Sequence, residues 1–271
     1  MQSPGFRYSF TPTLVATMPI DYDHAKNVHT LRGPRAALPF IFEEAMPESL
    51  LDVGCGTGTW LLAAQEMGVN DIFGVDGRAV EADQLLISKS LFRIQDLTQP
   101  WSLGRRFDTA LCLEVAEHLD APFGPALIDA LAAHSDSIVF GAACPDQPGQ
   151  HHVNCQWPAY WQSLFNERGF VCADSVRWRM WNDERIEWWY RQNIFVARRD
   201  PAAAGKEPGI VAAVHPAMLR VVKDREFSQS VKQIEQGYLP FSWYLRHAPR
   251  AMLTKIWRRS LRFIGSSFSG A

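Results

Sequence analysis

A glycine-rich loop between an apolar run and a helix-forming segment constrains the fold of this chain more than any other feature. Ser49–Val53 has the composition of a short buried strand, and glycines follow it at positions 54, 56 and 58. An apolar helix is expected from Trp60 onward. Glycine lets the backbone turn sharply and approach a ligand closely. The pattern therefore predicts a tight turn from strand to helix, which either holds a ligand or only reverses the chain.

The spacing within this loop separates the kinds of nucleotide site that it could form. A dinucleotide-binding loop has the spacing GxGxxG, whereas Thr59 occupies the place of the third glycine here. The Gly-Lys-Ser/Thr sequence of a phosphate-binding P-loop is also missing. Asp52 lies just before the loop, where a carboxylate would repel a pyrophosphate. The loop is better suited to the amino group of a cationic ligand.

Acidic residues stand at the ends of three further expected strands. Asp76 ends the second strand, Asp96 follows the third and Glu114 ends the fourth. A carboxylate can accept hydrogen bonds from ribose hydroxyls or from the amino group of adenine. Ligands of open α/β sheets bind at the carboxyl ends of the strands. Each acid taken alone fits a helix cap or a solvated turn equally well, but together with Asp52 they predict a site for a cationic, ribose-bearing ligand.

Strand and helix patterns alternate along most of the chain. Strands are expected at 49–53, 71–75, 91–94, 107–113, 137–142, 170–177 and 192–199. Helices are expected at 31–45, 79–86, 125–133, 157–168 and 217–235. This alternation favours an α/β fold with a mostly parallel sheet, and the two late strands favour an antiparallel finish at one edge.

The order of the motifs resembles that of the Rossmann-like (class I) S-adenosylmethionine-dependent methyltransferases. LDVGCGTG, GVDG, QDL and FDTALCLEVAEHL carry the resemblance, which covers about residues 45–200. It implies a doubly wound, seven-stranded sheet whose last strand is inserted antiparallel, with S-adenosylmethionine as cofactor. The residues that the resemblance assigns to the cofactor are Asp52, Gly54, Gly56 and Gly58 for the methionine part, Asp76 with Gly77 for the ribose, Asp96 and Leu97 for the adenine, and Glu114 for the outer wall.

The methyl acceptor is expected to bind beside the segment that follows the fifth strand. A hydroxyl acceptor needs a general base, for which His152 is favoured and His118 is second, although both also fit purely structural roles. The predicted substrate-binding residues are Tyr22, His151, Asn154, Trp157 and Trp181. The adjacent histidines 151 and 152 lack a matched carboxylate or cysteine spacing, so no metal site is expected.

The stretch GQHHVNCQWPAYWQSLFNERGF resembles, more loosely, sequences that accompany polysaccharide and glycolipid biosynthesis enzymes among these methyltransferases. We therefore expect methyl transfer to a hydroxyl of a small molecule or glycan, in polysaccharide, glycolipid or secondary-metabolite synthesis. Two alternatives remain open from the sequence, an N-methyltransferase and a noncatalytic S-adenosylmethionine-binding subunit.

Composition and charge divide the chain into three predicted parts. Residues 1–44 form an N-terminal flap and helix, 45–200 form the cofactor-binding domain, and 201–271 form a basic helical extension after a Pro/Gly/Ala-rich linker. Residues 1–200 carry 16 Lys and Arg against 25 Asp and Glu, whereas residues 201–271 carry 11 against 4. The two regions are therefore expected to meet different surroundings.

Residues 248–264 have the pattern of a basic amphipathic helix, which suits an anionic membrane surface or a protein partner as well as packing on its own domain. A nucleic-acid partner is not expected, because the body is acidic and the Asn/Asp-Pro-Pro-aromatic motif of base methylation is missing. The chain has no apolar run long enough to span a membrane, and its five cysteines show no CxxC spacing. These features predict a cytoplasmic protein, with peripheral attachment to a membrane as one option.

Overall fold

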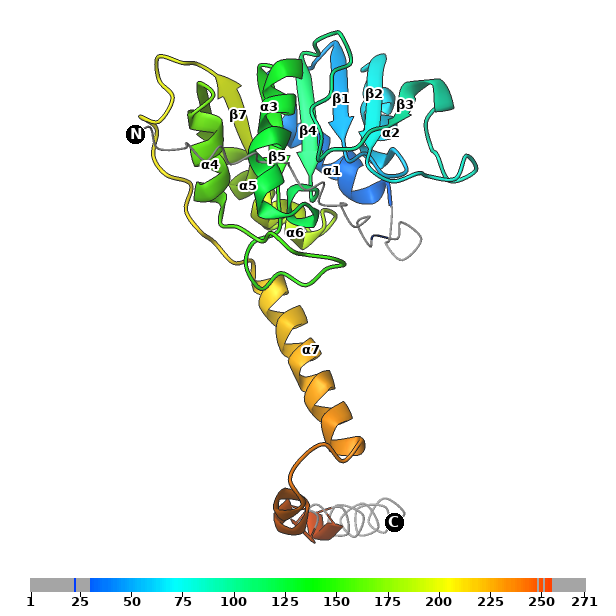
Figure 1. The fold of residues 1–271 in the computed structure, drawn as a ribbon, viewed down its shortest axis with the longest axis vertical. Coiled ribbons are helices and arrows are strands. Elements are labelled where there is room, and N and C mark those ends of the chain that lie inside the picture. The colour runs from blue at the N-terminus through cyan, green and yellow to red at the C-terminus, as the bar shows by residue number, and fades with distance from the viewer. Residues whose placement is uncertain (1–21, 23–29, 248, 251, 255–271) are drawn as a thin grey trace, which may run out of the picture. The chain divides into compact units, whose positions relative to one another are not determined.

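The fold is built on one seven-stranded sheet, in a computed structural model that describes residues 22, 30–247, 249–250 and 252–254. The strand order is β3-β2-β1-β4-β5-β7-β6 (Figure 1). The strands are β1 (Ser49–Val53), β2 (Asp71–Asp76), β3 (Phe92–Ile94), β4 (Thr109–Leu113), β5 (Ser137–Gly141), β6 (Phe170–Ala173) and β7 (Phe195–Arg199). Neighbouring strands pair in parallel except at β7, which runs antiparallel to both β5 and β6. The predicted α/β class and the inserted antiparallel strand are confirmed.

Helices cover both faces of the sheet because its central strands are apolar on both sides. All five residues of β4 are buried, as expected for a strand in the middle of a parallel sheet. Adjacent residues of β1 point to opposite faces: Leu51 packs with α3 (Gly124–His134) and α4 (Pro158–Asn166). Leu50 packs with α1 (Arg32–Ile41), α2 (Thr59–Glu66) and α5 (Ser175–Met180). Figure 1 shows α3 and α4 in front of the sheet.

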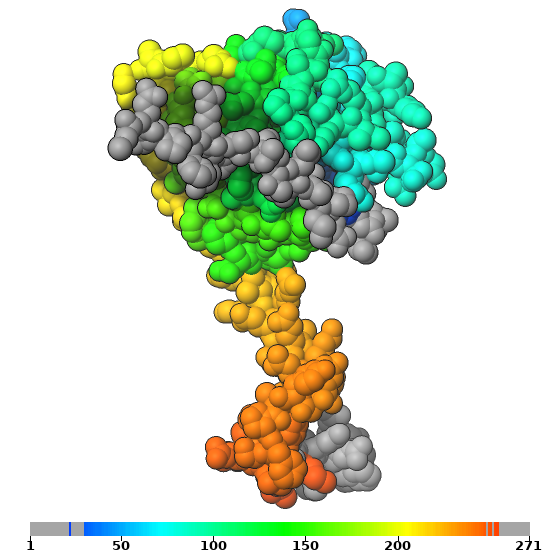
Figure 2. Space-filling view, in the orientation of Figure 1, coloured from blue at the N-terminus to red at the C-terminus, as the bar shows by residue number. Residues whose placement is uncertain are grey.

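The remaining helical elements are short, apart from α7. They are the 3-10 helices η2 (Lys89–Leu91), η3 (Ala116–His118) and η4 (Ala121–Phe123), with α6 (Trp188–Asn193) and α7 (Pro216–Glu235). Figure 2 shows the same face with all atoms drawn. Over the sheet, this face is formed mainly by the segments coloured cyan and green. These segments include the turns that follow β2 and the helices that follow β4.

Three sequence-based expectations are corrected by the structure. The helix predicted at 79–86 is wrong, because this segment forms turns. A hydrogen bond from Leu86 N to Thr57 O joins these turns to the glycine loop. The strand predicted at 170–177 stops at Ala173, after which α5 begins. The strand predicted at 192–199 starts only at Phe195, because residues 188–193 form α6.

The chain separates into two compact units, Met1–Met218 and Leu219–Ala271. The first unit includes residues 201–218, which the sequence analysis assigned to the extension. Ile210 joins its core, and Glu207 accepts hydrogen bonds from Gln162, Asn166 and the Cys172 backbone. Most of the predicted helix at 248–264 lies outside the described residues. None of the described helices combines the length and hydrophobicity needed to cross a membrane.

Candidate active site

The glycine loop has a backbone that only glycine adopts without strain at three of its positions. Gly54, Gly56 and Gly58 have φ angles of 79°, 52° and 84°, in the left-handed region that side chains disfavour. A Cβ atom on Gly54 would lie 2.2 Å from Val115 Cγ2, and one on Gly58 would lie 3.0 Å from Ile87 Cγ1. The loop therefore depends on close packing against Val115, which follows β4, and against Ile87 in the segment after β2.

Asp52 and Asp76 lie side by side beneath this loop, and both are buried. The Gly56 N–H donates to Asp76 Oδ2 at 2.8 Å, and the Arg78 N–H donates to Asp76 Oδ1 at 2.8 Å. Asp52 Oδ2 has no hydrogen-bond partner within the described part of the chain. Burial, together with the charge of Asp76, raises the pKa of Asp52 to about 8. An orphaned, buried carboxyl of this kind fits the ammonium group of a cationic ligand.

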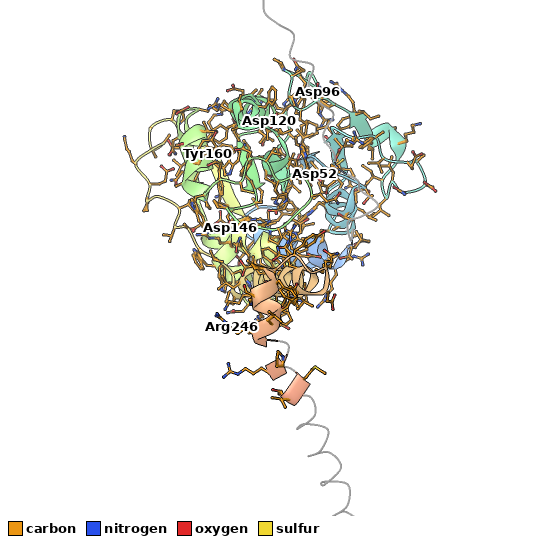
Figure 3. All side chains as sticks on the ribbon, turned by 60° about the horizontal axis from the view of Figure 1, so that its bottom comes forward. Asp52, Asp96, Asp120, Asp146, Tyr160 and Arg246 are labelled. Atoms are coloured by element: carbon orange, nitrogen blue, oxygen red, sulfur yellow. The ribbon has the colours of Figure 1, made fainter. Side chains whose placement is uncertain are left out.

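Asp96 lies at the rim rather than in the interior. It is exposed, and its Oδ1 accepts hydrogen bonds from the backbone N–H and the hydroxyl of Thr98. Leu97 beside it is buried. Gly77 has no atom closer than 3.8 Å to the position of an added Cβ. Figure 3 shows Asp52 within the body of the first unit and Asp96 near its edge, so the two acids differ strongly in their surroundings.

Glu114 is held in a strained conformation directly after β4. Its φ angle of 56° is unusual for a residue with a side chain. The carboxylate accepts from Asn193 Nδ2 at 2.8 Å and from Gln147 Nε2 at 2.6 Å. Burial raises its pKa despite these two hydrogen bonds. Strain of this kind is costly and is concentrated at functional sites.

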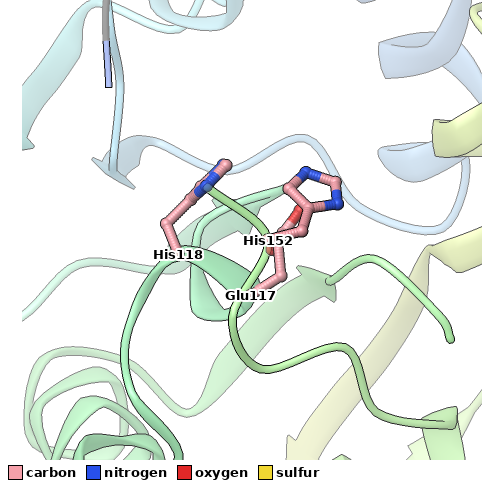
Figure 4. Close-up of side chains that lie close together, drawn as sticks. All are labelled: Glu117, His118 and His152. Atoms are coloured by element: carbon pink, nitrogen blue, oxygen red, sulfur yellow. The ribbon is translucent and has the colours of Figure 1, made fainter. Parts of the chain in front are cut away.

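Three side chains converge just beyond Glu114, at Glu117, His118 and His152 (Figure 4). One nitrogen or oxygen atom from each lies within 4.8 Å of the corresponding atoms of the other two. The imidazole rings of His118 and His152 are 5.1 Å apart and tilted by 66°. Glu117 is completely buried, and neither of its carboxylate oxygens has a hydrogen-bond partner among the described residues. We call these three residues the Glu-His-His cluster.

Backbone carbonyls fix the tautomers of both histidines in this cluster. His118 Nδ1 lies 3.3 Å from His151 O, and His152 Nδ1 lies 3.0 Å from Gln147 O. A carbonyl oxygen can only accept, so each neutral ring donates through Nδ1 and keeps a lone pair on Nε2. Burial, aided by the neighbouring His152, lowers the pKa of His118 to about 4, and burial also lowers the pKa of His152. Glu117 has a raised pKa because of its burial and the charge of Glu114.

The residues predicted to bind the acceptor have different positions. Tyr22 packs edge-on against the His118 ring at 4.7 Å, so it lies beside the cluster. Asn154 is buried and accepts from Gln156, whereas the His151 side chain and Trp157 are exposed. Trp181 packs against Trp178 and His215, and no ring contact joins it to the cluster within the described residues.

Four polar residues of this region were not assigned by the sequence analysis. Gln147 and Asn193 hold the Glu114 carboxylate, and Gln192 Nε2 extends their network to Cys144 Sγ. Glu117 lies in the motif LEVAEHL between two residues that were assigned. No local pattern set it apart from a solvated acid, because its complete burial comes from the fold.

Comparisons with known proteins found one family model and a number of solved structures. A family model described as a methyltransferase domain matches residues 24–193, and no curated protein matched the chain. Magnesium protoporphyrin IX methyltransferase from Synechocystis PCC 6803, crystallised with SAH, is 22% identical over 61% of this chain and 80% of its own, with a TM-score of 0.45. The methyltransferase domain of bacterial CtHen1-C is 16% identical over 63% and 100%, with a TM-score of 0.46.

The plantazolicin methyltransferase BpumL, solved in complex with a substrate analogue and SAH, is 13% identical over 62% of this chain and 83% of its own, with a TM-score of 0.44. The family model alone spans more than half of the chain, from the residues before α1 to the end of α6. With the sheet order described above, it shows that the chain belongs to the methyltransferase domain family and is a Rossmann-like (class I) S-adenosylmethionine-dependent methyltransferase.

Proposed function

We propose that this enzyme methylates a hydroxyl group of a small molecule or glycan. The observation that carries the proposal is the Glu-His-His cluster, which lies just beyond Glu114, a residue proposed to face the cofactor. A hydroxyl is a poor nucleophile until its proton is removed or its oxygen is polarised. The Nε2 lone pairs of His118 and His152 supply groups able to do so, with His152 as the predicted base.

The residues at the carboxyl ends of β1 to β4 are proposed to hold the cofactor. Asp52 would pair with the ammonium group of the methionine part, since its buried oxygen has room for a donor. Asp76 would accept hydrogen bonds from ribose hydroxyls with its buried carboxylate. Asp96 and Leu97 would contact the adenine from the rim. When bound, S-adenosylmethionine supplies a methyl group that its sulfonium already activates.

The protein's own contribution to the chemistry is then position and desolvation. Glu114 is fixed by Asn193 and Gln147, so the wall between the cofactor loop and the cluster is rigid. The Tyr22 ring packs edge-on against the His118 ring and would help to shield that side of the ring from water. The resemblance of residues 149–170 to sequences that accompany glycan-synthesis enzymes supports a glycan as the methyl acceptor.

Methyl transfer from labelled cofactor to fractionated lipid, glycan and small-molecule pools tests the proposal. We expect labelled product in which the methyl group is bound to oxygen. A methyl group bound to nitrogen would show an N-methyltransferase instead. Cofactor binding without transfer to any pool would show a noncatalytic subunit.

We propose separately that the basic residues after Glu235 attach the enzyme to an anionic membrane surface. No acidic residue follows Glu235, while six Lys and Arg do, and clustered basic residues bind anionic lipid. Flotation with phosphatidylserine vesicles should recover the full-length protein and much less of a variant with Arg258, Arg259 and Arg262 changed to Gln. Equal recovery of both proteins would refute the membrane contact and favour a protein partner.

A further inference from the structure

The Glu-His-His cluster contains hydrogen-bond acceptors but lacks the donors that would satisfy them. Both imidazoles use Nδ1 as donor to a carbonyl, which leaves Nε2 of each as an acceptor. The ionised carboxylate of Glu117 offers only acceptors, and within the described residues neither of its oxygens meets a donor. Buried acceptors that face each other without a proton or cation between them repel one another, and leaving them unsatisfied is costly.

A cation would satisfy all of these acceptors at once. The cluster's atoms lie within 4.8 Å of one another, so small side-chain movements bring them onto one ion at ordinary ligand distances of about 2.0–2.2 Å. Glu114 adds a second, half-buried carboxylate that interacts electrostatically with Glu117, which favours a positive charge at this place. Gly149 makes room for the His152 ring, because a Cβ there would lie 1.9 Å from His152 Nε2.

The surroundings of the two rings match those of metal-bound histidines. Such a histidine donates its other ring N–H to a backbone carbonyl or carboxylate, which orients the ring and fixes its tautomer. His118 donates to His151 O and His152 donates to Gln147 O. One carbonyl therefore supports each ring, as in an assembled metal site.

We propose that Glu117, His118 and His152 bind one divalent transition-metal ion, such as Mn²⁺ or Zn²⁺. Two imidazoles with one carboxylate suit these ions better than Mg²⁺ or Ca²⁺, which prefer oxygen ligands alone. The sequence analysis expected no metal because it considered the adjacent pair His151 and His152. The fold instead pairs His152 with His118, which lies 34 residues earlier, and adds Glu117 from the same short helix.

The role of the ion rests on the proposed hydroxyl methylation, although its binding does not. An ion at this place polarises an acceptor hydroxyl as a Lewis acid, so His152 serves as a ligand and no longer as the base. The acceptor oxygen forms a bond to the methyl carbon while the carbon–sulfur bond breaks. The electron pair of that bond returns to sulfur, and the hydroxyl proton passes to solvent water.

The test is titration of the metal-free, full-length protein with MnCl₂ and ZnCl₂ by calorimetry, and with CoCl₂ by visible absorption. We expect one ion per chain and an absorption band for Co²⁺ bound to nitrogen ligands. Glu117→Gln, His118→Ala and His152→Ala should each weaken binding at least tenfold. His151→Ala is the matched control for metal binding, because its exposed ring lies outside the cluster while its backbone carbonyl remains.

Cofactor titration of the same variants separates loss of the site from loss of the fold. Each variant should still bind S-adenosylmethionine with an affinity within a few-fold of the wild type. The proposal is overturned if the wild type binds none of the three ions, or if the three variants bind them as tightly as His151→Ala does.

Chelation distinguishes this inference from the proposed function. Loss of methyl transfer with EDTA and its return with Mn²⁺ or Zn²⁺ would support both. Hydroxyl methylation that EDTA leaves unchanged would keep the proposed function and refute the catalytic ion. Tight metal binding by an enzyme that methylates nitrogen would keep the site and refute the hydroxyl acceptor.

Discussion

Single residues with the same chemistry have different roles here because their burial differs. Asp52 and Asp96 both follow strands in the sequence, yet Asp52 is buried with an unpaired oxygen, while Asp96 is exposed and bonded to Thr98. Burial, together with the charge of Asp76, raises the pKa of Asp52 to about 8. We therefore expect Asp52 to control how cofactor affinity depends on pH.

The affinity for S-adenosylmethionine should rise between about pH 6 and pH 7.5. With a pKa of about 8, Asp52 is mostly protonated in the free protein over this range, whereas pairing with an ammonium group requires its ionised form. Binding therefore releases a proton, and the affinity increases by up to about tenfold per pH unit. Calorimetry at several pH values measures this slope, and Asp52→Asn should flatten it. A wild-type affinity that is constant over this range would contradict the role of Asp52.

The residues that sequence reasoning proposed for the site are those that a local sequence pattern marks. Asp76 and Glu114 could be assigned because each ends an apolar run, and strand ends are visible as patterns. Glu117 could not be distinguished from an ordinary solvated acid, since its importance comes from complete burial by distant parts of the chain. The approach of His152 to His118 depends on the path of the loop after β5, which no local pattern specifies.

Helices and strands were predicted well where the apolar pattern of the sequence agrees with the burial of the same residues in the fold, as in β1, β2 and β4. The predicted helix at 79–86 fails because tertiary contacts outweigh the helix propensity of its residues. Ile87, just after this segment, packs against Gly58, and Leu86 N bonds to Thr57 O. The glycine loop and the turns after β2 therefore form one structural unit.

Substituting Gly54 by Ala tests this packing at the level of the loop. The positive φ of Gly54 costs about 1–3 kcal/mol for a residue with a side chain, and the new Cβ must also displace Val115. Gly68→Ala is the matched control, because Gly68 also has a positive φ, of 106°, but its Cβ would meet nothing within 4 Å. Urea denaturation should show the larger loss for Gly54→Ala, together with weaker cofactor binding. Equal stability of the two variants would mean that Val115 yields without cost.

At the scale of the whole molecule, the segment after β7 belongs to the first compact unit although its composition is that of a linker. Composition predicted a boundary near residue 200, but Glu207 and Ile210 pack back onto α4 and β6. Burial alone would raise the pKa of Glu207. Hydrogen bonds from Asn166, the Cys172 backbone and Gln162 outweigh burial and lower the pKa to about 2.

Glu207→Gln should therefore destabilise the first unit at pH 7, by about 1–2 kcal/mol. Folding lowers the pKa of Glu207, so its ionised carboxylate stabilises the folded protein at pH values above its unfolded pKa of about 4.3. This stabilisation is lost as the pH falls toward 2. The difference from the wild type in urea denaturation should thus narrow between pH 4 and pH 2. Glu44→Gln is the control, because that exposed carboxylate bonds only to Arg198 among the described residues and its loss should matter little. A pH-independent difference for Glu207→Gln would contradict the account.

Calorimetric titration with S-adenosylmethionine tests the central claim most directly. The account predicts one cofactor per chain for the wild type. Asp76→Ala should bind at least about tenfold more weakly, since it removes charge-assisted hydrogen bonds and frees the Gly56 N–H that Asp76 now holds. Asp96→Ala, at the exposed rim, should lose less. A wild-type protein that binds no S-adenosylmethionine, or an Asp76→Ala variant that binds it unchanged, would contradict the assignment of this sheet edge as the cofactor site.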